Sequence, residues 1–325
     1  MDKRKWVQAL VAFTTNAHVQ GFLQGKIYKG KLKNVCVPGL NCYSCPGALG
    51  ACPIGAMQAV EGSTRYGISM YVLGFLVFVG VLLGRFVCGW LCPFGWIQEL
   101  LHKLPGRKTK VPSKVNAVLK WVKYGVLLVF VLLFPMLTVN QFGVATPYFC
   151  KYLCPAGTLE GGVPLLLSNE TLRGAVGLLF SWKLAVLLVT MAASVLVFRP
   201  FCRYLCPLGA FYSLFNPISF YRYSVDADRC IKCGKCTKAC KMDIAAYQTP
   251  NALECIRCGD CIRACPVGAI RSGFRTRPSH APVADGENGK GSRVFDRADA
   301  LPSGNEPAPY MPELKGARQD RGQNI

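Results

Sequence analysis

Residues 230–266 contain two copies of one cysteine pattern, CIKCGKCTKAC at residues 230–240 and CIRCGDCIRACP at residues 255–266. Each copy spaces its cysteines as C-x2-C-x2-C-x3-C, which is the spacing of bacterial ferredoxins with two [4Fe-4S] clusters. Lys241 replaces the usual proline after the first copy, but all eight thiolates are in place. In such proteins the fourth cysteine of each copy binds the other cluster. We therefore predict one cluster bound by Cys230, Cys233, Cys236 and Cys265, and a second bound by Cys255, Cys258, Cys261 and Cys240.

The composition indicates a membrane protein, because 51% of the 325 residues are hydrophobic. The net charge is +21, and residues 275–325 contribute only +1, from eight Lys/Arg and seven Asp/Glu. Basic residues beside apolar spans are typical of the positive-inside bias and of attraction to anionic lipid. We therefore predict that membrane lipid is a partner and that nucleic acid is not.

Three apolar stretches, at residues 68–87, 119–139 and 177–198, approach the length of about 20 residues that crosses a bilayer. Residues 6–23 are a fourth candidate, which either crosses the membrane or lies along its surface. The basic start of the chain is followed by no small-residue cleavage site, so we expect it to be retained. Residues 100–123 carry seven Lys/Arg and no Asp/Glu, which predicts a cytoplasmic loop. Counting crossings then predicts a multi-pass protein of the cell membrane with its ferredoxin-like region in the cytoplasm.

A second motif occurs three times, as FVCGWLCPFG at residues 86–95, YFCKYLCPAG at residues 148–157 and PFCRYLCPLG at residues 200–209. Two cysteines four residues apart share one helical face. The proline that follows suits the first turn of a new helix, whose free N–H groups favour an anionic cluster. Because successive spans reverse direction, the first and third copies share one membrane face. We predict a third [4Fe-4S] cluster bound by Cys88, Cys92, Cys202 and Cys206; the alternative is that these are buried apolar cysteines at helix ends.

Six further cysteines are predicted on the opposite face, and the sequence leaves their roles open: Cys36, Cys42, Cys45, Cys52, Cys150 and Cys154. One possibility is a cluster held by Cys36, Cys42, Cys45 and Cys52, and another is a cluster held by Cys150 and Cys154 with two loop cysteines such as Cys42 and Cys45. A spare pair could be a redox-active dithiol, or the group could form plain disulfides. Cys-Pro-x-Gly recurs at Cys52 and Cys154, as at Cys92, Cys206 and Cys265, which favours a fourth cluster.

Polar residues near these motifs have two interpretations. Gln98, Glu99, His102 and Glu160 could serve a proton-coupled quinone site, or they could be the solvent-facing side of interfacial helices. The sequence contains no dinucleotide-binding motif, no phosphate loop and no hydrolase motif. We therefore name no catalytic residue.

These patterns predict an α-helical polytopic membrane protein with a C-terminal ferredoxin-like (α+β) lobe. The membrane domain covers residues 1–222, with three or four spans and cysteine-rich loops, and the two-cluster lobe covers residues 223–274. Residues 275–325 are rich in Pro, Gly, Ser, Asp and Arg. They have too little apolar surface to bury, so burial cannot compensate for the conformational entropy that folding would remove. We predict a disordered tail there.

On its motifs the chain resembles the membrane-bound 4Fe-4S electron-transfer proteins with Cys-x3-Cys-Pro motifs. That family includes the quinol dehydrogenase membrane component of periplasmic nitrate reductase, the nitrous-oxide reductase regulatory protein and the ferredoxin-like assembly protein of cytochrome oxidase. The resemblance covers residues 68–270 and is carried by Cys88, Cys92, Cys202, Cys206 and the eight ferredoxin cysteines.

The resemblance implies electron transfer between a cytoplasmic or quinone donor and redox partner proteins on one or both membrane faces. This chain departs from the family in its copy at Cys150 and Cys154 and in its cysteine-rich loop at residues 36–52, which suggests that electrons continue to the far side. We thus expect an electron-transfer subunit of an oxidoreductase system. The alternatives are a membrane redox sensor or assembly factor, and an electron donor to extracytoplasmic thiol/disulfide partners.

Overall fold

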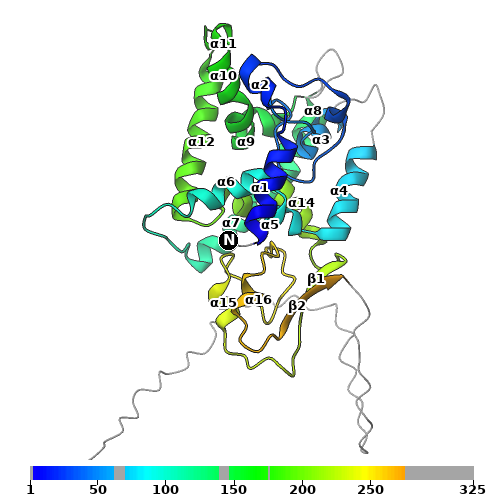
Figure 1. The fold of residues 1–325 in the computed structure, drawn as a ribbon, viewed down its shortest axis with the longest axis vertical. Helices are drawn as coiled ribbons and strands as arrows, with labels where there is room; N and C mark the ends of the chain where they lie inside the picture. Colours follow the sequence, from blue (N-terminus) through cyan, green and yellow to red (C-terminus); the bar gives the residue numbers. More distant parts are fainter. Residues whose placement is uncertain (1–2, 62–69, 139–145, 175, 275–325) are drawn as a thin grey trace, which may run out of the picture. The chain divides into compact units, whose positions relative to one another are not determined.

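The structure is a computed structural model that describes residues 3–61, 70–138, 146–174 and 176–274. The described chain is mostly helical, and its paired strands lie in the C-terminal part (Figure 1). The predicted tail at residues 275–325 lies outside the described residues. The helices before the lobe are α1 Lys3–Thr15, α2 Val19–Gln24, η1 Lys31–Asn34, α3 Pro53–Glu61, α4 Met70–Leu83, α5 Phe86–Trp90, α6 Pro93–Leu101, α7 Ser113–Val126, η2 Leu127–Leu133, α8 Phe134–Leu137, η3 Phe149–Leu153, α9 Pro155–Gly157, η4 Thr158–Gly162, α10 Val163–Ser168, α11 Glu170–Gly174, α12 Leu178–Leu196, α13 Pro200–Tyr204 and α14 Pro207–Phe215.

Two helices of the described chain are long and apolar enough to cross a membrane. One is the continuous run α7–η2–α8 (Ser113–Leu137, 25 residues), and the other is α12 (19 residues). Only 22% and 17% of the residues in their most apolar windows are buried, so their apolar side chains face outward rather than into a protein core. They correspond to the spans predicted at residues 119–139 and 177–198.

The other two predicted spans differ from the structure. Helix α4, within the span predicted at residues 68–87, has 14 residues and is followed by Gly84 at a φ of 50°; residues 68–69 lie outside the described residues. Residues 6–23 do not form one helix, because α1 ends at Thr15 and α2 begins at Val19. The Thr15 hydroxyl and the Asn16 amide donate to carbonyls of the last turn of α1, and such local hydrogen bonds compete with continuation of a helix.

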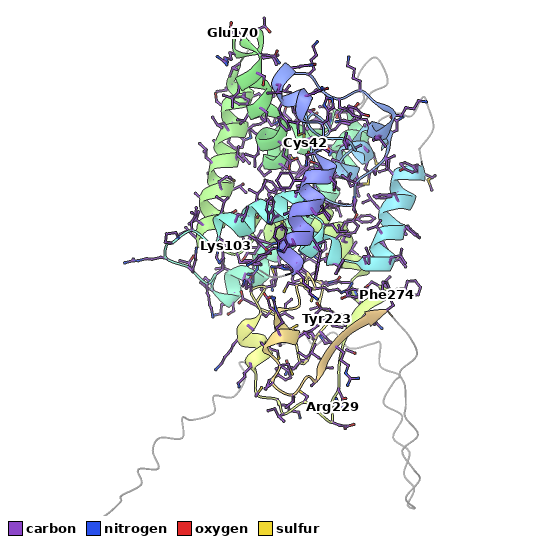
Figure 2. The ribbon with its side chains drawn as sticks, viewed as in Figure 1. Cys42, Lys103, Glu170, Tyr223, Arg229 and Phe274 are labelled. Atoms are coloured by element: carbon purple, nitrogen blue, oxygen red, sulfur yellow. The ribbon has the colours of Figure 1, made fainter. Side chains whose placement is uncertain are left out.

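The C-terminal lobe consists of β1 Tyr221–Val225, α15 Lys235–Ala239, α16 Asp260–Ala264 and β2 Ile270–Phe274. The strands pair antiparallel, with Tyr221 opposite Phe274 and Val225 opposite Ile270. Figure 2 labels Tyr223 and Phe274 on these strands and Arg229 in the following loop. The short strand pair and the two short helices of the lobe thus frame its cysteine-rich loops.

Buried ion pairs join the lobe to the helical region. Glu254 of the lobe accepts from Arg85 at 2.8 Å and from Lys123 of α7. Both cationic side chains have no exposed surface. Because a buried charge is costly without a partner, this three-residue network fixes where the lobe packs.

Candidate iron-sulfur sites

The eight ferredoxin cysteines surround two small recesses in the lobe. Each recess has a volume of about 20 Å³. Lys232 and Arg257 occupy the same place in the two copies and share a left-handed φ of 52°, so the two cysteine loops bend in the same way. The structure brings together Cys230, Cys233, Cys236 and Cys265 around one recess, and Cys240, Cys255, Cys258 and Cys261 around the other.

A third set of cysteines, here called site A, lies in the helical region and consists of Cys88, Cys92, Cys202 and Cys206. All of them are buried, and burial together with repulsion between neighbouring thiolates raises the pKa of Cys92, Cys202 and Cys206. Cys92 begins helix α6 and Cys206 begins helix α14, each followed by proline. The sulfur of each accepts from the N–H of the glycine three residues later, at 3.4 Å. These helix starts direct N–H groups at the sulfurs, which suits an anionic cluster.

Two buried arginines flank site A. Arg85 donates to the carbonyl of Cys202 at 3.1 Å, and Arg199 donates to the carbonyl of Cys88. Arg199 also pairs with Glu99 at 2.8 Å. Burial raises the pKa of the Cys92 and Cys206 thiols, so ionised thiolates there need positive partners. Iron and the two guanidinium groups are such partners, and the residues of site A therefore fit a cluster.

Helix α6 supplies two of the polar residues that the sequence singled out. Gln98 donates from Nε2 to the sulfur of Cys202 at 3.0 Å and accepts at Oε1 from the N–H of Phe201 at 3.2 Å. Glu99 pairs with Arg4 and Arg199. Gln98 and Glu99 are 0% and 6% exposed, so they are not the solvent-facing side of an interfacial helix. That interpretation is wrong for both, because the helix packs them against the cysteines and a buried arginine pair.

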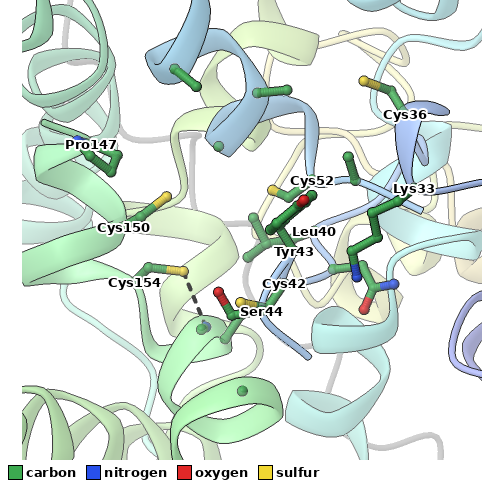
Figure 3. A pocket seen from close by; sticks show the side chains of 18 of the residues that line it. Lys33, Cys36, Leu40, Cys42, Tyr43, Ser44, Cys52, Pro147, Cys150 and Cys154 are labelled. Atoms are coloured by element: carbon green, nitrogen blue, oxygen red, sulfur yellow. Dashed lines mark hydrogen bonds between the residues drawn. The ribbon is translucent and has the colours of Figure 1, made fainter. Parts of the chain in front are cut away.

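A cavity of about 630 Å³ lies in the helical region near α3 and α9. Figure 3 shows the sulfurs of Cys42, Cys52, Cys150 and Cys154 turned toward a common space in it; we call this set site B. A Cβ on Gly157 would lie 3.5 Å from the sulfur of Cys42 and 3.8 Å from that of Cys154. Burial raises the pKa of Cys42 and of Cys150 to about 12, so these thiols are neutral unless a positive group binds them.

Site B has the form of the second possibility, in which two loop cysteines join Cys150 and Cys154, and those two are Cys42 and Cys52. Cys36 lines the same cavity but its sulfur points away from the other four (Figure 3), since its backbone is held in a β-bridge with Ala51. Cys45 donates from its thiol to Asn16 at 3.5 Å. All 18 cysteines, which lie in the described part of the chain, are free thiols. The sequence left open which two loop cysteines accompany Cys150 and Cys154, and the cavity brings Cys42 and Cys52 toward them.

Glu160 and His102 are bonded within the fold. Glu160 is half-buried and accepts from the N–H of Cys42 at 2.7 Å, and removal of its carboxyl from water raises its pKa to about 7. The Nδ1 atom of His102 lies 3.2 Å from the carbonyl of Ser194.

Within the described ranges, no three His, Cys, Asp or Glu side chains meet as they would on one metal ion. The thiolates of a [4Fe-4S] cluster bind separate iron atoms, so they need not converge in that way.

Comparison with known proteins identifies the family. A 4Fe-4S binding domain family (Fer4_5) matches residues 66–112, 125–168 and 178–220, and a second (Fer4) matches residues 223–244 and 249–271. An uncharacterized protein of Methanocaldococcus jannaschii is 31% identical over 191 residues, which are 57% of this chain and 69% of that one. The chain belongs to the ferredoxin-type 4Fe-4S electron-transport proteins.

Two other relatives of this ferredoxin-type chain have descriptive names. The methylamine utilization ferredoxin-type protein MauN of Methylorubrum extorquens is 28% identical over 59% of this chain and 58% of its own length. The regulatory protein NosR of Pseudomonas aeruginosa is 34% identical over 40% of this chain, which covers only 16% of NosR. No solved structure is significantly similar to the chain. The family resemblance predicted from the cysteine motifs is therefore confirmed.

Proposed function

We propose that this chain is a multi-pass membrane protein that passes electrons between two cytoplasmic ferredoxin-type clusters and a quinone or extracytoplasmic acceptor. In this proposal the lobe at residues 223–274 holds two [4Fe-4S] clusters through its eight cysteines. Site A holds a third in the membrane domain at residues 1–222. When bound, such clusters accept and release single electrons.

One contact supports the proposal most strongly: the backbone of site A touches the backbone of the lobe between their cysteines. Gly89 lies between Cys88 and Cys92, and a Cβ on it would lie 2.1 Å from the carbonyl oxygen of Ile256, which follows Cys255. Next to it, Trp90 donates from Nε1 to the carbonyl of Arg257 at 2.9 Å. Because electron tunnelling slows steeply with distance, such direct contact suits transfer between the two sites.

The residues around this contact also exclude water. Phe94 and Phe201 pack edge to face at 5.3 Å beside site A, and neither is more than 1% exposed. Arg85 and Glu254 close the junction with the lobe by a buried ion pair. A dry environment strengthens the hydrogen bonds and charges that act on the thiolates.

Exposed apolar surface supports the membrane part of the proposal. Leu128 of η2 is 62% exposed, and Leu188 and Val189 of α12 are 60% and 69% exposed. Lipid would cover such helices, whereas a soluble protein would bury them. The seven Lys/Arg at residues 100–123 favour a cytoplasmic position for that segment and hence for the lobe.

The proposal is tested with protein reconstituted into liposomes that enclose a membrane-impermeant electron acceptor. Adding a membrane-impermeant reductant outside is expected to reduce the enclosed acceptor faster than in protein-free liposomes. Cys202→Ser, which removes a site A ligand, is expected to return the rate to that of protein-free liposomes. If protein with its full iron content does not exceed that rate, the chain is no conduit, and a redox sensor or an assembly factor replaces the proposal.

A further inference from the structure

Site B repeats the construction of site A in a different part of the chain. Both sites draw two cysteines from Cys-Pro-x-Gly segments, which begin helices α6 and α14 at site A and α3 and α9 at site B. At Cys154 the N–H of Gly157 points to the sulfur at 3.4 Å, the same distance as at Cys92 and Cys206. Cys52 has the same sequence context, because Pro53 begins helix α3 directly after it. Three of the four helix starts therefore present an N–H group to a sulfur, and the fourth, at Cys52, shares their Cys-Pro-x-Gly sequence.

A pair of glutamines makes the correspondence more specific. Gln58 and Gln98 each lie six residues after the cysteine of a Cys-Pro-x-Gly segment. Gln98 bridges Cys202 and the N–H of Phe201. Gln58 donates from Nε2 to the sulfur of Cys150 at 3.5 Å and accepts from the N–H of Phe149 at 3.1 Å. Both glutamines have no exposed surface. Each one joins its own helix to a Phe-Cys pair on another segment of the chain.

Charge and space at site B also suit a cluster. Lys33 and Lys183 line the same cavity as the four sulfurs, so positive charge lies close to them. The cavity of about 630 Å³ is far larger than the lobe recesses of about 20 Å³, which carry the ferredoxin ligand pattern. Positive charge and N–H donors around four sulfurs suit an anionic cluster.

We infer that site B binds a fourth [4Fe-4S] cluster through Cys42, Cys52, Cys150 and Cys154, with Gln58 as a positioning residue that holds Cys150. Each thiol loses its proton to solvent when it binds iron, so the ligands are four thiolates. Cys36 and Cys45 are not ligands. The inference extends the proposed electron-transfer path by one centre, but its test does not depend on electron transfer.

The ligand set is tested by serine substitution and iron counting after anaerobic purification. Cys42→Ser and Cys150→Ser are each expected to lose about four irons per chain, with the spectra of the lobe clusters intact. Cys36→Ser and Cys45→Ser are the matched controls, because both cysteines lie in the same loop, and they are expected to keep the parent iron content. Unchanged iron in Cys150→Ser, or loss of iron in a control, would overturn the assignment.

A second measurement uses the parent protein, so it does not depend on how the variants fold. Anaerobic alkylation followed by mass spectrometry is expected to label Cys36 and Cys45 after mild unfolding of the loop, while the site B cysteines stay protected until iron is chelated. Protection of a different set would refute the inference. Failure of the liposome assay with this iron content intact would instead refute only the proposed function.

The positioning role of Gln58 is tested by midpoint potentials from an EPR-monitored redox titration. N–H···S hydrogen bonds stabilise the reduced, more negative state of a cluster. Gln58→Leu is therefore expected to lower the potential of the site B cluster alone, and Gln98→Leu that of the site A cluster alone. Each variant is the control for the other. Unchanged potentials in Gln58→Leu, or a shift at site A, would refute the role.

Discussion

Replacing Glu254 with alanine is expected to destabilise the packing of the lobe by about 3–5 kcal/mol, because it leaves two buried cations without an anionic partner. Glu254 is the acidic member of the network with Arg85 and Lys123, which have no exposed side-chain surface. We expect rapid proteolytic release of the lobe under conditions in which the parent protein is resistant. Glu254→Gln, which keeps the shape and removes the charge, is expected to have an effect in the same direction.

Asp226→Asn is the control for that experiment. Asp226 pairs with Arg229 at 3.4 Å, and their side chains are 35% and 58% exposed. Exposed pairs contribute roughly 0–1 kcal/mol, so this variant should resist protease almost as well as the parent. Equal resistance of Glu254→Ala and the parent protein would show that the ion pairs do not hold the lobe in place.

Replacing Gly89 with alanine is expected to block electron transfer between the lobe and site A while leaving the iron content unchanged. The added Cβ would lie 2.1 Å from the carbonyl oxygen of Ile256, and such overpacking against backbone typically costs about 1–3 kcal/mol. The lobe must therefore move away from the helix that carries Cys88. The liposome assay is expected to show a rate close to that of protein-free liposomes.

Gly74→Ala is the matched control, because it also adds a Cβ within a helix but meets nothing within 4 Å. It should transfer electrons at the parent rate. If Gly89→Ala also keeps the parent rate, electrons do not pass through the contact between Gly89 and Ile256, and another route connects the centres.

Much of the chemistry was predictable because cluster ligands follow strict local spacing. The paired C-x2-C-x2-C-x3-C runs predict both ligand sets of the lobe, and each set surrounds its own recess in the structure. Cys-Pro at Cys92 and Cys206 predicts the start of a helix, because proline lacks the N–H that a first helical turn leaves free. Hydropathy likewise predicted the two long apolar helices, because their outward-facing residues are apolar along the whole length.

The bonding role of the glutamines escaped prediction, although a signal was present: Gln98 was singled out only for a quinone site or a solvent-facing position, and Gln58 was not singled out. Gln58 and Gln98 share the spacing Cys-Pro-x-Gly-x2-Gln, but a polar residue on a short helix fits a solvent-facing position equally well. Their role appears only when the segment that carries Cys150 or Cys202 packs against that helix. The buried ion pairs of Arg85 and Arg199 depend in the same way on contacts between distant segments.

By itself, the sequence determined the type of chemistry and predicted the candidate ligands that lie close together along the chain, because a short cysteine run fixes its own geometry. Only the tertiary structure decided which distant cysteines share site B. Cys42 and Cys52 are separated from Cys150 and Cys154 by about a hundred residues, and no local spacing encodes such a pairing. The packing of α3 and α9 around one cavity turns the sulfurs toward a common space, while the β-bridge at Cys36 and the hydrogen bond at Cys45 hold those two thiols aside.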